Sequence, residues 1–312
     1  MKDSTKGILL ACLSALMWGL LAIALKIALN YTDSYTIVWW RFAASFFILT
    51  FFYLFRSPRS LRVLKNPPKI LLLGGVLLGI NFYGFQQGIE HAGPAVSQVI
   101  IQAGPVNLAL IGFIIFKEKI NFVRITGFLL AATGFYFFYH QQMQVMPDGG
   151  GTLRIGALWT FAGALAWTGY AIINKIMVKR MAPMQINLII YGIPALLFIP
   201  FADFQTLFVL KSPIVWLLFL FLALNTILAY GGLSIALKYT EANRISMIVT
   251  LNPIITFIIL EILLLMNVHW FESPPMAPMA YIGALMVLGG VALAVGARKV
   301  QWKWKRTRGK ND

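Results

Sequence analysis

Long apolar runs alternate with short polar connections along almost the whole chain. Each run holds about 20 apolar residues, the number that an α-helix needs to cross a bilayer. The runs lack the strict alternation of apolar and polar residues that strands of a membrane barrel require. The pattern therefore predicts ten membrane-spanning helices, over residues 7–29, 35–55, 69–89, 93–116, 122–140, 154–175, 184–201, 213–237, 243–266 and 279–297. Only the residues "EHAG" separate the third helix from the fourth.

The two halves of the chain resemble each other. "SALMWGLLAIALK" (residues 14–26) and "GALAWTGYAIINK" (residues 163–175) both place a lysine eight residues after a tryptophan. "SQVIIQAGPVNLALIGFI" (residues 97–114) corresponds to "ISMIVTLNPIITFIILEI" (residues 245–262), and a proline stands at the same place in both. These matches indicate a tandem duplication.

The fifth and tenth predicted helices extend the duplication, because "GFLLAATG" (residues 127–134) corresponds to "GALMVLGG" (residues 283–290). The repeated unit thus contains five helices. Five is odd, so the second copy must enter the membrane from the opposite side. We therefore expect an all-α integral membrane fold of two inverted five-helix repeats, 1–145 and 146–300, followed by a basic tail, 301–312. Inverted repeats are typical of secondary transporters, whose binding sites lie near the bilayer midplane.

The composition supports a membrane location. The chain is 59% hydrophobic and 12% charged, with a mean hydropathy of +0.78, far more apolar than a globular domain. The first apolar run follows Lys2 and Lys6, as in a signal peptide, but it is too long and lacks a clear cleavage site. We expect it to be retained as the first helix. The single Cys12 excludes an internal disulfide framework.

The distribution of positive charge predicts the orientation. If the N-terminus is cytoplasmic, all of the 26 Lys and Arg residues except Lys26, Arg41, Arg154 and Lys211 fall on the cytoplasmic side. This bias follows the positive-inside rule. We expect a multi-pass protein of the inner (cytoplasmic) membrane, with both termini in the cytoplasm. The net charge of +16 then reflects orientation and contact with anionic lipids, so we expect no nucleic-acid partner.

These residues together resemble the EamA-type domain of the drug/metabolite transporter superfamily. The resemblance rests on "ALMWGLLAIALK", "WWRF", "AVSQVIIQAGPVNLALIGFIIFKEKI" and "RITGFLLAATGFYFF", which carry the family pattern at Trp18, Gly19, Lys26, Arg41, Pro105, Glu118, Gly127 and Gly134. It implies a ten-helix exporter or exchanger of small metabolites, with a central cavity lined mainly by helices one, three, four, six, eight and nine. We assign gating or structural roles to Lys26, Arg41, Pro105, Glu118 and Pro253. The second copy departs from the pattern, since Met266 replaces the terminal glutamate.

Polar and aromatic side chains inside the predicted helices are the substrate-binding candidates. Gln98 and Gln102 lie one helical turn apart and in register with Pro105, and amides suit an uncharged polar ligand. Trp18 and Trp167 fall near mid-span, where two indoles could stack on a flat ring. The alternatives are interhelical hydrogen bonding for the amides and packing for the indoles. The full set is Trp18, Asn81, Tyr83, Gln98, Gln102, Trp167, Tyr170, Asn225, Tyr230 and Asn252.

Two carboxylates are candidates for proton coupling. Glu261 lies inside the ninth predicted helix, and an ionisable group in hydrocarbon costs at least about 2.5 kcal/mol, so it is retained when it pairs or works. We predict that Glu261 loads and releases a proton. The alternative is a buried ion pair with Lys26 or Arg41. Glu90, at the outer end of the third helix, is the second candidate for proton coupling.

Other chemistry is not indicated. The three histidines lie in separate loops without metal-ligand spacing, and there is no phosphate-binding G-x-x-x-x-G-K-[ST] loop. We therefore expect no metal, no cofactor and no enzymatic activity. The prediction is a proton-coupled exporter or exchanger of small molecules such as nucleobases, purines or amino acids. The alternatives are an exporter of cationic drugs or quaternary amines, an integral-membrane lipid-modifying enzyme, and a structural or partner-binding protein. A monomer and a homodimer both stay open.

Overall fold

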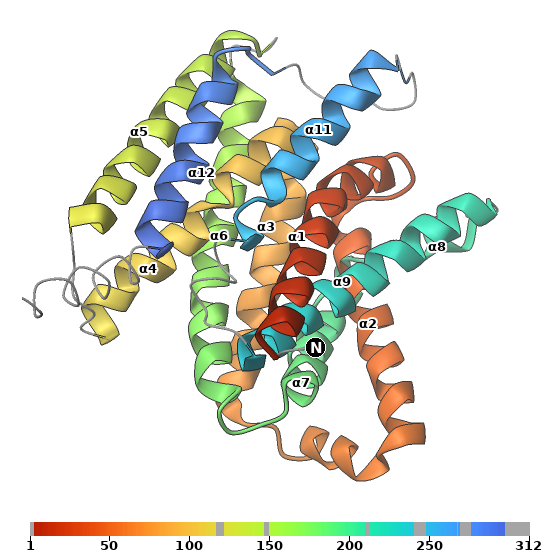
Figure 1. Ribbon diagram of the computed structural model, residues 1–312. Helices are drawn as coiled ribbons and strands as arrows, with labels where there is room; N and C mark the ends of the chain where they lie inside the picture. Colours follow the sequence, from red (N-terminus) through yellow and green to blue (C-terminus); the bar gives the residue numbers. More distant parts are fainter. Residues whose placement is uncertain are drawn as a thin grey trace, which may run out of the picture.

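The computed structural model describes residues 3–116, 122–146, 150–209, 212–239, 248–266, 268 and 276–296, and the regular elements among them are all helices (Figure 1). The expected all-α membrane fold is confirmed. The α-helices are α1 (Asp3–Ala28), α2 (Ser34–Arg56), α3 (Lys69–Ile100), α4 (Ala103–Phe116), α5 (Phe122–Gln144), α6 (Gly151–Met177), α7 (Pro183–Leu197), α8 (Phe204–Val209), α9 (Pro213–Tyr239), α11 (Asn252–Leu265) and α12 (Ala280–Gly296). The 3-10 helices are η1 (Pro58–Leu64) and η2 (Ile199–Phe201). Glu118 and the tail 301–312 lie outside the described residues.

Seven helices in the described part of the chain are long and apolar enough to cross a membrane. They are α1, α2, α3, α5, α6, α7 extended by η2, and α9. The apolar helices α4, α11 and α12 are shorter, with 14, 14 and 17 residues. Each of the ten ranges that the sequence predicts to cross the membrane contains a described helix.

The short connection predicted between the third and fourth spans is a bend inside α3. Gly93 has φ 84° and ψ 168°, a conformation that glycine adopts at little cost. Pro94 follows it and begins a new helical stretch, where a missing N–H costs nothing. The Ser97 hydroxyl donates to the Gly93 carbonyl (2.9 Å) and closes the bend. The chain therefore changes direction at "EHAG" through a bend in the helix and without a loop.

The fourth and ninth predicted spans are each interrupted, which corrects the expectation of continuous helices over 93–116 and 243–266. The first interruption is a turn at Ile101 and Gln102, and the second is a turn at Thr250 and Leu251. Each turn lies two to four residues before a proline. Proline has no N–H to donate to the carbonyl four residues earlier, and its ring clashes with that carbonyl, so each span breaks there.

The two interruptions meet in space. Gln102, in the first turn, donates from Nε2 to Oδ1 of Asn252, the first residue of α11, at 2.9 Å. Both side chains are buried. A side-chain amide pair thus joins the two broken spans, one from each half of the chain.

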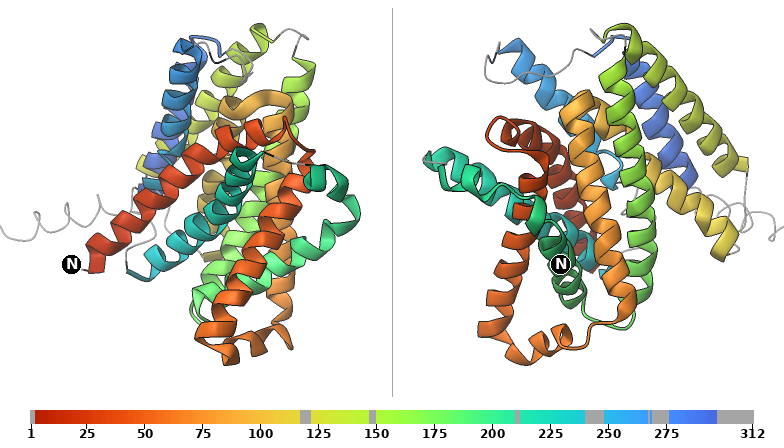
Figure 2. Two further views of the ribbon diagram at one scale, coloured as in Figure 1. Left: turned by 90° about the vertical axis from the view of Figure 1, so that its right-hand side faces the viewer. Right: turned by 180° about the vertical axis from the view of Figure 1, so that it is seen from behind.

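Close helix pairs build the rest of the fold. Helices α5 and α12 lie side by side in Figure 1, and α3 and α6 lie side by side in the view from behind in Figure 2. Glycines at Gly127 and Gly134 of α5 face Gly283 and Gly290 of α12 in this contact, and a Cβ at any of the four would clash with backbone atoms of the other helix. Small residues let membrane helices approach closely.

Two aspartates cap the starts of α2 and α8. The Asp33 carboxylate accepts hydrogen bonds from the N–H groups of Tyr35 (2.8 Å) and Thr36 (3.0 Å). Asp203 caps α8 in the same way, and the hydrogen bond from the Thr206 hydroxyl holds the pKa of Asp203 below its usual range. The backbone N–H of Asp203 donates to the Thr36 hydroxyl (2.7 Å). These caps satisfy N–H groups that a helix start leaves without partners and connect the two helix starts.

Two neighbouring glycines of α12 provide a matched test of the α5–α12 contact. A Cβ at Gly290 would lie 2.7 Å from the Gly127 carbonyl oxygen, whereas a Cβ at Gly289 would meet only Leu130 Cδ2 at 3.8 Å. We expect Gly290→Ala to destabilise the protein by about 1–3 kcal/mol through overpacking. Gly289→Ala should leave stability equal or slightly higher, because alanine favours helix. Thermal unfolding in detergent measures both, and equal melting temperatures would contradict this account of the contact.

The Gln102–Asn252 pair can be tested by a double-mutant cycle. Gln102→Leu or Asn252→Leu alone leaves a buried amide without its partner, so each should lower the free energy of unfolding by about 1–3 kcal/mol. The double variant should recover part of this loss. The coupling energy should be about 0.6 kcal/mol and at most about 1.7 kcal/mol, the average and the maximum measured for hydrogen bonds between membrane helices. Strictly additive effects would mean that the bond does not join the two spans.

Candidate functional site

A central cavity of about 90 Å³ lies where the two broken spans meet. Seven helices or their turns contribute side chains to it. Its lining consists of Trp18, Leu21, Arg41, Asn81, Phe82, Phe85, Gln98, Ile101, Gln102, Pro105, Trp167, Tyr230, Val249 and Asn252. The structure thus brings together nine of the residues that the sequence singles out: Trp18, Arg41, Asn81, Gln98, Gln102, Pro105, Trp167, Tyr230 and Asn252.

Gln98 connects three helices at the wall of this cavity. Its Nε2 donates to the Trp18 carbonyl of α1 (2.8 Å) and to the Thr256 hydroxyl of α11 (3.1 Å). Thr256 in turn donates to the Gly19 carbonyl (2.8 Å). The amide nitrogen of Gln98 therefore makes hydrogen bonds between helices. From the sequence, this was the alternative to substrate binding. Sequence reasoning missed Thr256, although it lies one turn after Asn252 on the same helix.

Two asparagines make similar contacts in the two halves. Asn81 of α3 donates from Nδ2 to the Gly163 carbonyl of α6 (3.0 Å). Asn225 of α9 donates from Nδ2 to the Met17 carbonyl of α1 (2.6 Å). Both are buried, but only Asn81 is among the residues that line the cavity. Their amide nitrogens hold helix pairs together.

Aromatic rings form one wall of the cavity. Tyr230 packs edge-on against Trp18, with ring centroids 5.2 Å apart, and lies 5.6 Å from Phe82. Trp18 and Trp167 are both half-buried and line the cavity. Phe82 and Phe85 were not predicted, because phenylalanines in an apolar span carry no signal that separates the cavity from the lipid.

Arg41 brings a positive charge to the cavity. Its side chain is 1% exposed. Nε donates to the Thr226 hydroxyl (3.3 Å), and the guanidinium carbon lies 4.0 Å from the centre of the Phe82 ring. Sequence reasoning gave Arg41 a gating or structural role and missed Thr226, the residue directly after Asn225.

Several predicted residues lie away from the cavity. Tyr83 stacks on Tyr35, with centroids 4.6 Å apart. Tyr170 is buried beside Tyr230 (6.0 Å), and its hydroxyl accepts a hydrogen bond from Asn174 (3.2 Å). Tyr83 and Tyr170 therefore pack against other aromatic rings and are not among the residues that line the cavity. Lys26 is half-buried in the last turn of α1, and Pro253 is buried in the first turn of α11.

The two carboxylates predicted to couple protons also lie away from the cavity. Glu261 is exposed on α11 and accepts a hydrogen bond from the Tyr281 hydroxyl of α12. The alternative of a buried ion pair is wrong, since the partner is Tyr281 rather than Lys26 or Arg41. Glu90 is exposed and accepts hydrogen bonds from the Ser34 hydroxyl (2.5 Å) and Gln87 Nε2 (2.9 Å).

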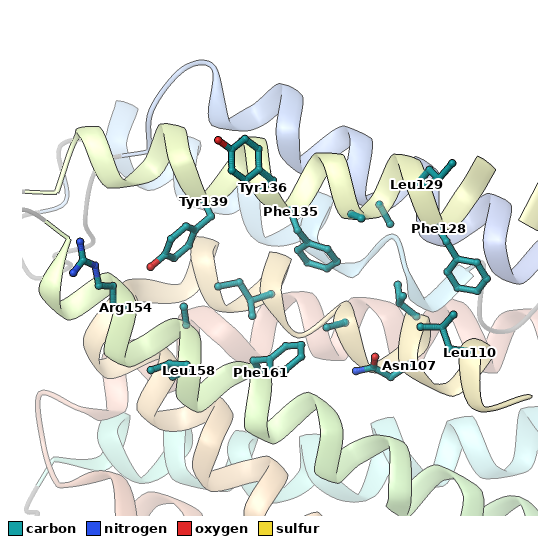
Figure 3. Close-up of a pocket in the computed structure, with 16 residues that line it drawn as sticks. Asn107, Leu110, Phe128, Leu129, Phe135, Tyr136, Tyr139, Arg154, Leu158 and Phe161 are labelled. Atoms are coloured by element: carbon teal, nitrogen blue, oxygen red, sulfur yellow. The ribbon is translucent and has the colours of Figure 1, made fainter. Parts of the chain in front are cut away.

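A larger groove of about 880 Å³ runs between α4, α5 and α6 (Figure 3). Phe135 and Tyr139 point from α5 toward α6, and Arg154 and Phe128 lie toward its two ends (Figure 3). Its lining is mostly apolar and includes strongly exposed side chains such as Leu129 (65%). It offers few hydrogen-bonding groups to a polar solute. The smaller central cavity, with buried polar groups from both halves, is the better candidate site.

Comparisons with known proteins agree with this fold. The chain is 30% identical over 296 residues to an uncharacterized transporter of Haemophilus influenzae, covering 94% of this chain and 96% of the relative. It is 30% identical over 298 residues to the uncharacterized inner membrane transporter YhbE of Escherichia coli K12, covering 94% and 92%. It is 24% identical over 312 residues to a probable amino-acid metabolite efflux pump of Salmonella typhimurium, covering 96% and 97%.

A solved crystal structure has the same fold, with a TM-score of 0.63 at 18% identity over 92% of this chain and 96% of the other. The model of the EamA-like transporter family matches residues 5–140 and again residues 154–296. These two matches cover most of the sequence and together include every residue that lines the central cavity. The chain therefore belongs to the EamA-like transporter family and is a membrane transporter of the drug/metabolite transporter superfamily.

Proposed function

We propose that the chain is a proton-coupled secondary transporter that exports or exchanges small polar or aromatic metabolites, such as amino acids or nucleobases. The observation that carries this proposal is the central cavity, where amides, indoles and one guanidinium from both halves of the chain converge. Ligand sites in proteins typically combine an apolar lining with a few polar groups that orient the ligand. The cavity has this composition.

Alternating access between two inverted repeats is the proposed mechanism. In such a repeat, α1 corresponds to α6 and α3 to α9, so the close pair α3–α6 should have a counterpart in α9–α1. Both pairs are extensive contacts, and both contain an asparagine that donates to a backbone carbonyl. Transporters of this kind place their sites where discontinuous helices of the two repeats meet. The Gln102–Asn252 junction supports the same arrangement here.

The substrate class rests on the cavity and on one relative. A cavity of about 90 Å³ favours a small solute over a lipid. Aromatic walls favour a flat or apolar body, because rings stack on rings. The Salmonella relative is named as a probable amino-acid metabolite efflux pump, which supports amino acids within the proposed range. The relative from Escherichia coli is named as an inner membrane transporter, and we propose the same membrane for this chain, with both termini cytoplasmic.

Transport through the cavity is tested by matched tryptophan variants in proteoliposomes. Trp18 lines the cavity, whereas Trp159 of α6 is 40% exposed and lies outside it. The test screens radiolabelled amino acids, purines and quaternary amines for counterflow. For whichever compound is carried, Trp18→Ala should reduce the flux at least about tenfold, the effect of losing roughly 1.4 kcal/mol of binding. Trp159→Ala should leave the flux within about twofold of wild type. Equal effects of the two variants would place the substrate path elsewhere.

Proton coupling is tested at Glu261. If its carboxylate carries the proton, Glu261→Gln should abolish flux driven by an imposed pH gradient, while substrate counterflow, which needs no net proton movement, continues. Tyr281→Phe removes only the hydroxyl that donates to Glu261 and serves as the control for that contact. Unchanged gradient-driven flux in Glu261→Gln would assign coupling to another group, with Glu90→Gln as the next variant.

A further inference from the structure

Arg41 is a buried cation without an anionic partner in the described part of the chain. Its side chain is 1% exposed and lies inside a membrane-spanning helix. The described residues that line the cavity include no Asp or Glu. A charged side chain in the membrane interior is costly and is retained when it is paired or functional. Because no described carboxylate pairs with Arg41, an anionic ligand is a candidate for the missing partner.

The contacts that Arg41 does make leave its charge largely uncompensated. Nε donates to the neutral hydroxyl of Thr226 (3.3 Å), and the face of Phe82 lies 4.0 Å away. A ring face attracts a cation by about 0.5–2 kcal/mol, far less than the cost of burying the charge. No described protein group accepts a hydrogen bond from Nη1 or Nη2. Arg41 lines the cavity, so its two Nη groups can donate to a bound ligand.

We propose that Arg41 binds the carboxylate of the transported substrate, and that the substrate is a small monocarboxylate with a flat or apolar body. This inference rests on the proposed function and narrows its substrate class. The planar guanidinium presents two parallel N–H donors that match the two oxygens of a carboxylate. The Thr226 hydroxyl holds Nε and fixes the plane of the guanidinium. Trp18 and Tyr230 provide ring surfaces for the rest of the molecule.

Charge balance favours a monoanion over other ligands. One carboxylate neutralises one guanidinium, so the loaded cavity carries no net charge through the membrane interior. A dianionic phosphate ester would leave one negative charge uncompensated. A quaternary amine or cationic drug would add a second positive charge beside Arg41, and like charges at close range in a low dielectric repel strongly. The cavity therefore disfavours the cationic substrates that were an alternative from the sequence.

Matched acids and amides test the proposal on the purified full chain in lipid nanodiscs. Benzoate and benzamide have nearly the same shape and differ in charge, as do phenylacetate and phenylacetamide. Calorimetric titration should give a Kd for each acid at least tenfold lower than for its amide, which corresponds to about 1.4 kcal/mol. Choline, as a quaternary amine, should not bind. Equal affinity for acid and amide, tighter binding of choline, or no binding of either acid would overturn the proposal.

Arginine variants locate the anion site. Arg41→Gln should remove the preference for acid over amide, and Arg41→Lys should keep the preference with weaker binding, because lysine retains the charge without the planar pair of donors. Arg154→Gln is the matched control, since Arg154 lines the larger groove between α4, α5 and α6 and is not among the residues that line the central cavity. A preference that persists in Arg41→Gln would overturn the assignment. If Arg41→Gln fails to fold, weaker acid binding in Arg41→Lys, with Arg154→Gln unchanged, still tests the assignment to Arg41.

Failure of this inference and failure of the proposed function have different signatures. If the chain carries purines in proteoliposomes and binds acids and amides equally, the transport function stands and the carboxylate site does not. If the acids bind through Arg41 but nothing is carried in counterflow, the site stands and the transport function does not.

Discussion

Three consecutive backbone carbonyls of α1 connect the helices that surround the cavity. Met17, Trp18 and Gly19 accept hydrogen bonds from side chains of α9, α3 and α11, respectively. In a bilayer core no water is present to bond with polar groups, so each amide or hydroxyl must find its partner inside the protein. A helical carbonyl keeps a second lone pair after its own helical bond. These lone pairs position three neighbouring helices around one turn of α1.

The broken spans depend on the same constraint. Irregular backbone at membrane depth is tolerated only where it is buried in protein or lines a cavity. The first turn meets this condition, because Ile101 and Gln102 line the cavity. In the second turn Thr250 is buried and Leu251 is exposed, and the next residue, Asn252, bonds to Gln102 at the cavity. Proline breaks the spans, and the amides that flank each break stabilise it. The prolines remove backbone hydrogen bonds, and the side-chain amides beside them form new ones. The same amides provide part of the polar lining of the cavity.

The sequence predicted the helices well because membrane spans carry a strong apolar signal. It also predicted most of the polar lining, since Asn81, Gln98, Gln102 and Asn252 are rare residue types in apolar segments and each needs a buried partner. The breaks before Pro105 and Pro253 were not predicted, because proline in a membrane helix is also compatible with a kink. The phenylalanines of the wall could not be distinguished from lipid-facing ones. Which way a residue faces depends on helix rotation, and these helices are apolar all round.

Charged residues show the limit of reasoning by depth alone. From the sequence, a buried ion pair of Glu261 with Lys26 or Arg41 was the alternative to proton coupling. The structure separates them, since Arg41 is buried and lines the cavity, whereas Glu261 is exposed and bonds to Tyr281. Residues at the same depth can lie on opposite sides of a helix bundle. The cation that meets the substrate and the carboxylate proposed to carry the proton are therefore distinct sites. Helix α11 carries Glu261 and packs against α1 and α3, which also line the cavity, so movement of α11 against these two helices is the coupling route that the packing offers.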